Sequence, residues 1–217
     1  AKVKGGKRVT GVAVCAQAGE GSVQEEIACE AVAMSGGWSP VVHLWSHCGG
    51  KLLWDETISA FIPDPKRPPL NHDGSAMVDV VGSAAGDLDL SGQRVAIPPV
   101  WVMPQGAPIQ LRSKMWLDYQ NDVKVSDVQL ASREGYVSVE HTKRYTTLGM
   151  ATDQGKLSNI NGLAVLAETL GQEIPQVGTT TFRPPYTPVA SGPMVGHERG
   201  VRFPPPRRTA RPDWHAR

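Results

Sequence analysis

Two histidines and a cysteine have the spacing of metal ligands. His43 and His47 stand four residues apart, with Cys48 next to the second, so on a helix both imidazoles would share one face. A zinc site needs three or four such ligands, and no second cluster with suitable spacing occurs. None of the six histidines has a Ser or Cys partner in a pattern that supports nucleophilic catalysis. The sequence therefore predicts no metal site and no catalytic residue.

A run of small residues is the second feature that could do chemistry. Residues 82–86, Gly-Ser-Ala-Ala-Gly, directly follow residues 78–81, Val-Asp-Val-Val, which are predicted to form a short buried strand. Small residues after a strand let the backbone approach a ligand, or let a helix pack closely on the strand. On the residues alone both interpretations stay open.

The first half of the chain is expected to contain strands and one short helix. Residues 8–16 alternate with period two and residues 27–35 are mainly apolar, so both are predicted strands, paired as a hairpin through the Gly-containing residues 17–24. Residues 40–48 favour a short helix with Val41, Leu44 and Trp45 on one face, ended by two glycines.

The second half of the chain is expected to be helical. Ser126 and Gln129 form a capping-box pattern for a helix over residues 127–134, with Gly135 after its end. Ser138 is the predicted cap of a second helix through about residue 145. Residues 160–170 have a helical apolar pattern stopped by Gly171. Prolines interrupt the segments before and after these helices, which predicts a linker and an extended tail.

Composition narrows the class of protein. The chain has 217 residues, 22 Lys and Arg against 21 Asp and Glu, and a net charge of +1, so bulk attraction to nucleic acid is not expected. Three cysteines cannot build a disulfide framework or a four-cysteine metal site, which favours a reducing, cytoplasmic setting. No apolar run approaches the roughly 18 residues of a membrane span, and the basic start leads into alternating residues rather than a signal core.

Several long strings resemble the alpha subunit of heterotetrameric sarcosine oxidase. They are residues 139–166 (VEHTKRYTTLGMATDQGKLSNINGLAVL) and 177–188 (VGTTTFRPPYTP). Residues 35–45, 50–55, 61–64 and 212–215 also resemble that subunit, so the resemblance covers almost the whole chain. The resemblance implies that members of that family are much larger polypeptides. This chain resembles only the middle part of such a polypeptide. It has neither an opening G-x-G-x-x-G nor a folate domain.

The resemblance implies a fold class and a domain order. The expected fold is α+β: a partial dinucleotide-binding (FAD/NAD-type) sheet, then a small helical domain resembling a bacterioferritin-associated-ferredoxin-like module without its cluster, then an extended Pro-rich tail. The expected boundaries are residues 1–93 for the end of the dinucleotide-binding domain, 94–114 for a Pro-rich linker, 115–175 for the helical domain, and 176–217 for a tail leading towards a folate-binding domain.

The resemblance also implies part of an NAD site. In such folds the chain often contacts the cofactor at the turn that here carries Gly36 and Gly37, although a purely structural turn is the alternative. The implied cofactor-binding residues are Gly36, Gly37, Gly82, Ser83, Ala84, Ala85, Gly86 and Leu90. Many relatives carry an Asp where Ser83 stands, and this difference weakens an FAD interpretation more than an NAD one.

Two cysteine motifs that bind a 2Fe-2S cluster in amino-acid and opine dehydrogenase relatives have no counterpart here. Asp153 and Ser158 stand where cysteines of the second motif would be, and the first motif falls near Asp118 and Gln120. Iron in such clusters is held by thiolates, so no iron-sulfur cluster is expected. The helical domain should instead be a scaffold whose polar side chains contact other subunits; the candidates are Arg144, Thr146, Thr147, Asp153, Gln154 and Lys156.

For the complete complex, the resemblance implies oxidation of sarcosine at an FAD of the beta subunit, electron transfer to FMN, reduction of oxygen to hydrogen peroxide, and delivery of the methyl carbon to tetrahydrofolate. The partners would be beta, gamma and delta subunits, with no nucleic acid and no membrane. This chain alone should be inactive. Two alternatives stay open: an equivalent subunit for another secondary amine or an opine, and a non-catalytic assembly module.

Overall fold

The computed structural model describes residues 2–16, 20–33, 37–88, 98–102, 106–184 and 186–187. The chain divides into two compact units, residues 1–183 and 184–217, and every helix and strand given below lies in the first. The described part is a mixed α and β structure with small antiparallel sheets and short helices.

A three-stranded antiparallel sheet begins the chain. It consists of β1 (Lys2–Gly5), β2 (Val9–Cys15) and β3 (Val23–Ala28), in that order. The predicted strand over residues 8–16 and its hairpin are confirmed. The prediction of residues 27–35 as the second strand is wrong over residues 29–33, because β3 pairs Val23 with Cys15 and Ala28 with Gly11 and ends there. Residues 34 and 35 lie outside the described residues. β3 is an edge strand that is exposed along its whole length. Exposed strand residues need not be apolar, so the apolar pattern did not identify this strand.

Next come a short helix and a hairpin, α1 (His43–His47), β4 (Leu52–Asp55) and β5 (Ala60–Pro63). The helix was predicted, but its buried face was not: Val41 and Leu44 are 59% and 63% exposed, whereas Trp45 is buried. The Trp45 indole Nε1 donates to the Lys51 carbonyl at 2.7 Å. A Cβ at Gly50 would lie 2.4 Å from that ring. The hydrogen-bonded Trp45 ring fixes the orientation of α1. A helix of only five residues has too little stability of its own to adopt a different orientation.

The turn after β5 is held by the buried carboxylate of Asp64. Its Oδ2 accepts from Arg67 Nε at 2.6 Å and its Oδ1 from the Lys66 backbone N–H at 2.9 Å. The hydrogen bond from Arg67, followed by that from Lys66, holds the pKa of Asp64 below its usual value. The charged carboxylate is therefore the form that the folded chain prefers.

This preference predicts a pH-dependent contribution to stability. A carboxyl with a lowered folded pKa stabilises the fold above its unfolded pKa of about 4, and loses that contribution as pH falls through the lower folded value. Asp64→Asn should therefore lower the urea midpoint at pH 7, and its effect should shrink as pH falls from about 4 through the folded pKa. Equal midpoints of variant and wild type at pH 7 would contradict the assignment.

The predicted strand over residues 78–81 is wrong. These residues belong to no strand of the structure, and Val81 is 79% exposed. A bridge between Leu70 and Ala76 closes the preceding loop, so residues 78–81 leave it without a neighbouring strand to pair with. They lead into η1 (Gly82–Ala85), a single 3₁₀ turn that contacts β5.

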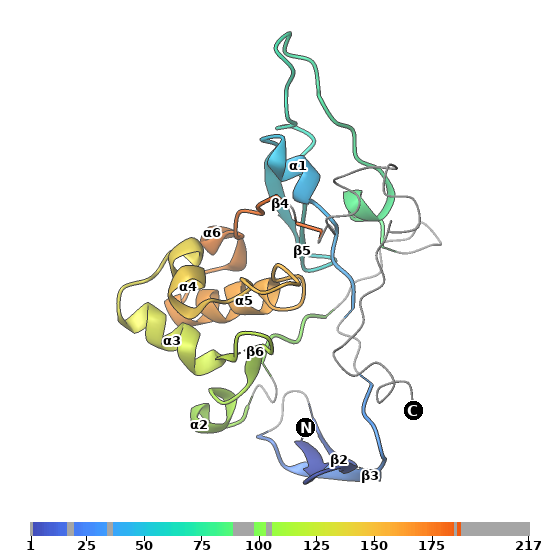
Figure 1. Ribbon diagram of the computed structural model, residues 1–217, viewed down its shortest axis with the longest axis vertical. Coiled ribbons are helices and arrows are strands. Elements are labelled where there is room, and N and C mark those ends of the chain that lie inside the picture. The colour runs from blue at the N-terminus through green and yellow to red at the C-terminus, as the bar shows by residue number, and fades with distance from the viewer. Residues whose placement is uncertain are drawn as a thin grey trace, which may run out of the picture. The chain divides into compact units, whose positions relative to one another are not determined.

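The second half forms the main core. Figure 1 shows α3 (Val125–Arg133), α4 (Val139–Thr146), α5 (Asn159–Leu170) and α6 (Ile174–Val177) gathered in one group, preceded by α2 (Ile109–Arg112), β6 (Trp116–Asp118) and β7 (Val123–Lys124). α3 packs against α4 and α5, and α5 packs against α6. Leu163 and Leu166 of α5 are at most 1% exposed and pack with Val128 of α3. Burial of α5 thus organises the helical half.

The three predicted longer helices are confirmed, with one change at a cap. Ser138 Oγ accepts from the His141 backbone N–H, and Gly171 ends α5 with φ 65°. The Ser126–Gln129 capping box is wrong, since α3 begins at Val125. Asp127 Oδ2 instead accepts from the Lys124 backbone N–H at 2.8 Å. The negative charge of Asp127 also interacts favourably with the positive end of the helix dipole, which an uncharged glutamine would do less well.

Candidate functional site

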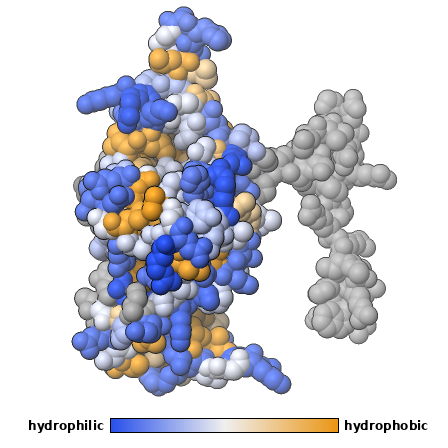
Figure 2. All heavy atoms as spheres, turned by 90° about the vertical axis from the view of Figure 1, so that its left-hand side faces the viewer, coloured by the Kyte–Doolittle hydropathy of each residue, from blue (hydrophilic) through white to orange (hydrophobic). Residues whose placement is uncertain are grey.

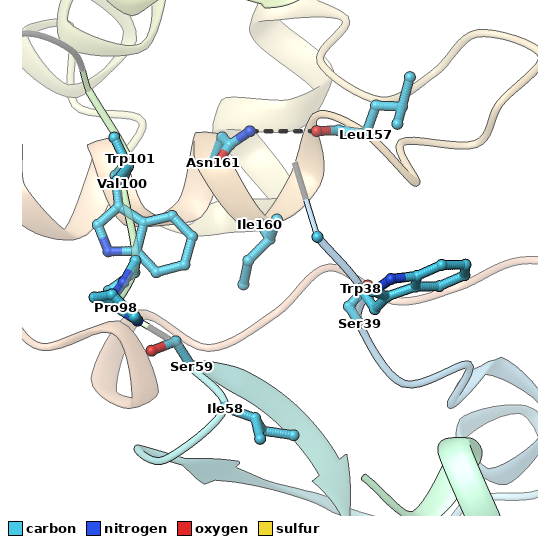
Figure 3. A pocket seen from close by; sticks show the side chains of 12 residues that line it. Trp38, Ser39, Ile58, Ser59, Pro98, Val100, Trp101, Leu157, Ile160 and Asn161 are labelled. Atoms are coloured by element: carbon cyan, nitrogen blue, oxygen red, sulfur yellow. Dashed lines mark hydrogen bonds between the residues drawn. The ribbon is translucent and has the colours of Figure 1, made fainter. Parts of the chain in front are cut away.

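A pocket of about 390 Å³ lies where four segments meet. Residues 37–39 precede α1, Ile58 and Ser59 belong to the β4–β5 turn, and residues 98–101 lie within the Pro-rich segment. Leu157 precedes α5, and Ile160 and Asn161 belong to its first turn (Figure 3). A pocket of this volume between separate structural elements is typical of small-molecule sites.

The pocket lining is apolar with a few polar groups. Trp38 is 80% exposed, and Trp101 lines the same pocket. Asn161 Nδ2 donates to the Leu157 carbonyl at 3.3 Å, drawn as the dashed line in Figure 3, so its carboxamide is fixed in orientation. None of the described residues that line the pocket carries a charge, so these walls suit a neutral ligand better than an ion.

The cofactor-binding residues predicted from the sequence do not all meet at this pocket. Gly37 lines it, with φ 95°. Gly82, Ser83, Ala84 and Ala85 form η1 and Gly86 ends it, and none of them is part of the lining. Leu88, just beyond, packs on Ile58, Ala60 and Ile62. Gly36 and Leu90 lie outside the described residues.

These residues fit only part of a dinucleotide. A Cβ at Gly82 would meet no atom within 4 Å. Glycine is therefore favoured at this position by the φ of 63°, and not by the close approach of another group. The four-residue turn η1 also lacks the aligned N–H groups with which a longer helix holds pyrophosphate. Trp101, Ser59 and Asn161 were missed because nothing in the sequence links their separate segments.

A second group of polar residues joins the β6–β7 turn to the loop between α4 and α5. Asp118 Oδ2 accepts from the Gly149 backbone N–H at 2.8 Å, and its Oδ1 accepts from the N–H groups of Gln120 and Asn121, each at 2.9 Å. Gln120 Oε1 accepts from the Thr152 hydroxyl at 2.7 Å. We call these contacts the Asp118 clasp. It joins residues 118–121 to residues 149–152, which directly precede Asp153.

The loop held by the clasp is arranged around Asn159. Its Nδ2 donates to Thr180 Oγ1 at 3.2 Å and to the Gln154 carbonyl at 3.4 Å. Asp153 Oδ1 accepts from the Gly155 N–H at 3.2 Å, and Ser158 is 1% exposed. The Asp153 carboxylate accepts from the loop itself, whereas Ser158 Oγ and Asn159 Oδ1 are buried without a hydrogen-bond partner among the described residues.

The described residues do not fit an iron-sulfur cluster or another metal. All three cysteines lie at or before position 48, so the clasp has no thiolate to offer. Within the described ranges no group of three His, Cys, Asp or Glu could hold a metal ion. The His43 and His47 rings meet edge to face, with centroids 5.6 Å apart. Burial first, then His47 and Lys156, keeps the pKa of His43 below its usual value.

The residues predicted to contact other subunits make mainly local interactions. Arg144 Nη1 lies 2.9 Å from Glu140 Oε2, and Thr146 Oγ1 donates to the Thr142 carbonyl one turn back. Lys156 Nζ donates to the Asp153 carbonyl at 3.3 Å, while Thr147 and Gln154 adopt positive φ. The face in Figure 2 has small hydrophobic patches separated by hydrophilic surface. It does not single out one contact region.

Glu140 is a polar anchor that sequence reasoning missed. Burial opposes its ionisation, but the Thr181 backbone N–H and the nearby Arg144 and Lys143 outweigh burial and lower its pKa. Burial, with help from Arg183 and Arg144, also lowers the pKa of Lys143. Glu140 and Asn159 thereby hold residues 180–181 against α4 and α5.

Comparisons with known proteins show the family to which the chain belongs. Residues 112–197 match the family model of the sarcosine oxidase A3 domain. The chain is 37% identical to a sarcosine oxidase subunit alpha of Rhizobium meliloti (strain 1021) over 97% of its own length, and 38% identical to that of Corynebacterium sp. (strain P-1) over 86%. It corresponds to a portion of a sarcosine oxidase alpha subunit. The chain spans only 23% and 22% of the length of these two relatives.

The fold has a solved counterpart. An L-proline dehydrogenase from P. horikoshii superposes with a TM-score of 0.60 over 87% of this chain and 42% of that protein, at 19% identity. This likeness concerns the fold alone. Among the described residues no helix is both long enough and apolar enough to cross a membrane.

Proposed function

We propose that this chain is part of the alpha subunit of an enzyme that converts sarcosine, tetrahydrofolate and oxygen to glycine, 5,10-methylenetetrahydrofolate and hydrogen peroxide. The observation that carries the proposal is the 37% identity to a sarcosine oxidase alpha subunit over 97% of the chain. The match of residues 112–197 to the A3 domain supports it. The complete enzyme would be an oxidoreductase acting on a CH–NH group, and this chain would contain none of its catalytic residues.

Within that enzyme the chain would contribute part of an NAD site and a surface for other subunits. The NAD contacts are assigned to Gly36, Gly37, residues 82–86 and Leu90, supported by the position of Gly37 in the pocket. FAD, FMN and tetrahydrofolate would be held elsewhere in a complex with beta, gamma and delta subunits. The surface for these partners would include Arg144, Thr146, Thr147, Asp153, Gln154 and Lys156.

The helical unit would be a scaffold derived from a ferredoxin-like module that has lost its cluster. The Asp118 clasp supports this proposal, because it connects the two former ligand segments through hydrogen bonds. We retain residues 115–175 for this unit, residues 1–93 for the end of a dinucleotide-binding domain, residues 94–114 for the linker, and residues 176–217 for a Pro-rich tail. No disulfide joins Cys15, Cys29 and Cys48 in the described part, which supports a cytoplasmic location.

The test is amine oxidation by the complete protein assembled with its partner subunits. Sarcosine should be oxidised with release of hydrogen peroxide, and added tetrahydrofolate should divert the methyl carbon from free formaldehyde to methylenetetrahydrofolate. The 217-residue chain alone should show no turnover. Dimethylglycine and an opine serve as competing substrates, and faster turnover of either would replace sarcosine in the proposal. An assembled complex that oxidises no amine would leave only an assembly role.

A further inference from the structure

Three cations meet where the segment after α6 is attached to α4. Glu140 Oε1 accepts from the Thr181 backbone N–H, and Arg183 follows two residues later, close enough to act electrostatically on Lys143. Lys143 and Arg144 come three and four residues after Glu140 in α4, so they share its face of the helix. We call Lys143, Arg144 and Arg183 the α4 cation cluster.

The one carboxylate at this place cannot balance the cluster. Both oxygens of Glu140 are already engaged: Oε1 accepts from Thr181, and Oε2 lies 2.9 Å from Arg144 Nη1. Within the described ranges no ion pair joins a carboxylate to Lys143 or Arg183. Three cations against one carboxylate leave two positive charges without a counter-charge.

The environment of Lys143 makes this excess of charge unfavourable. The side chain is half-buried, and burial is the largest influence on its pKa. Glu140 opposes burial, but Arg183 and Arg144 act with it, and together they lower the pKa of Lys143. A cation that has lost hydration beside like charges gains more from a bound anion than a fully exposed cation does.

We propose that the α4 cation cluster binds a phosphate group, with the Lys143 ammonium and the Arg183 guanidinium as its ligands. Near neutral pH a phosphate monoester carries about two negative charges, which match the two unbalanced cations. A guanidinium fork and an ammonium are the usual side-chain contacts of phosphate. A single carboxylate group would leave one of the cations unbalanced. The inference goes beyond the proposed function, because it does not depend on which amine is oxidised.

The experiment is equilibrium dialysis of radiolabelled inorganic phosphate against the complete assembled protein at constant ionic strength. Saturable binding is expected. Lys143→Met removes the ammonium and keeps most of the apolar stem, and Arg183→Gln removes the guanidinium of an exposed side chain. Each change should weaken phosphate binding at least about tenfold, as expected for loss of a charge-assisted hydrogen bond. Unchanged thermal midpoints would show that both variants are folded.

The matched control is Arg133→Ala, which removes an equal charge from an exposed residue of α3 that does not act on Lys143. It should leave phosphate binding unchanged. Competition by glycerol phosphate identifies the source of the group: a phosphate ester as ligand predicts displacement at least as strong as that by inorganic phosphate, and the free ion predicts weaker displacement.

Three results would each overturn the inference. They are absence of saturable phosphate binding, an equal loss of affinity in Arg133→Ala and in the cluster variants, and equal competition by succinate, which would indicate a dicarboxylate instead. Sarcosine oxidation measured on the same preparation tests the proposed function separately, so failure of one can be told from failure of the other.

Discussion

Asp118→Asn is expected to reduce the free energy of unfolding by about 3 kcal/mol, because it disrupts charge-assisted hydrogen bonds in the interior. Asp118 is 4% exposed, and its two oxygens accept from three backbone N–H groups on both sides of the clasp. An asparagine of the same size must direct its NH₂ either at Gly149 or at Gln120 and Asn121. In both orientations a buried donor faces another donor.

Urea denaturation gives the change in global stability, and exchange of the Gly149 amide proton reports on the clasp itself. Asp127→Asn is the matched control, because that carboxylate is only partly buried and accepts from the single N–H of Lys124. It should cost about 1 kcal/mol and leave exchange at Gly149 unchanged. If both variants lost the same stability, the clasp would have no special role in joining the two segments.

Local signals in the sequence predict the helical half well. Ser138, Gly135 and Gly171 act through their own backbone or through neighbours within one turn, so their role does not depend on distant residues. The apolar spacing in residues 160–170 similarly identifies α5, whose Leu163 and Leu166 are buried. The strands β6 and β7 were not predicted from the sequence. They are short, and their pairing depends on the turn held by Asp118.

The pocket and the edges of the small sheets depend on contacts that the sequence does not reveal. Trp101 and Asn161 are 60 positions apart and share one pocket only through the path of the chain between them. The face of α1 follows from the Trp45–Lys51 hydrogen bond rather than from helical periodicity. Residues 78–81 had the composition of a strand but no partner to pair with. In each case tertiary structure determined the outcome.

Gly149→Ala is expected to destabilise the protein by about 2–4 kcal/mol, for two separable reasons. Gly149 has φ 67°, a conformation that costs an alanine about 1–2 kcal/mol. A Cβ there would also lie 2.0 Å from Asn159 Oδ1. Asn159 cannot simply move away, because Gly155 closes around the same carboxamide: a Cβ at Gly155 would lie 2.3 Å from it.

Gly171→Ala separates the two costs, because Gly171 has nearly the same φ, 65°, and a Cβ there would meet nothing within 4 Å. Its loss of stability should therefore measure the backbone cost alone, and the excess in Gly149→Ala should measure crowding at Asn159. The double variant Gly149→Ala/Asn159→Ala should recover part of that excess while losing the hydrogen bond to Thr180. Equal losses in the two single variants would mean that the loop relaxes freely, and the glycines would then serve only backbone conformation rather than the enclosure that fixes residue 180 beside α5.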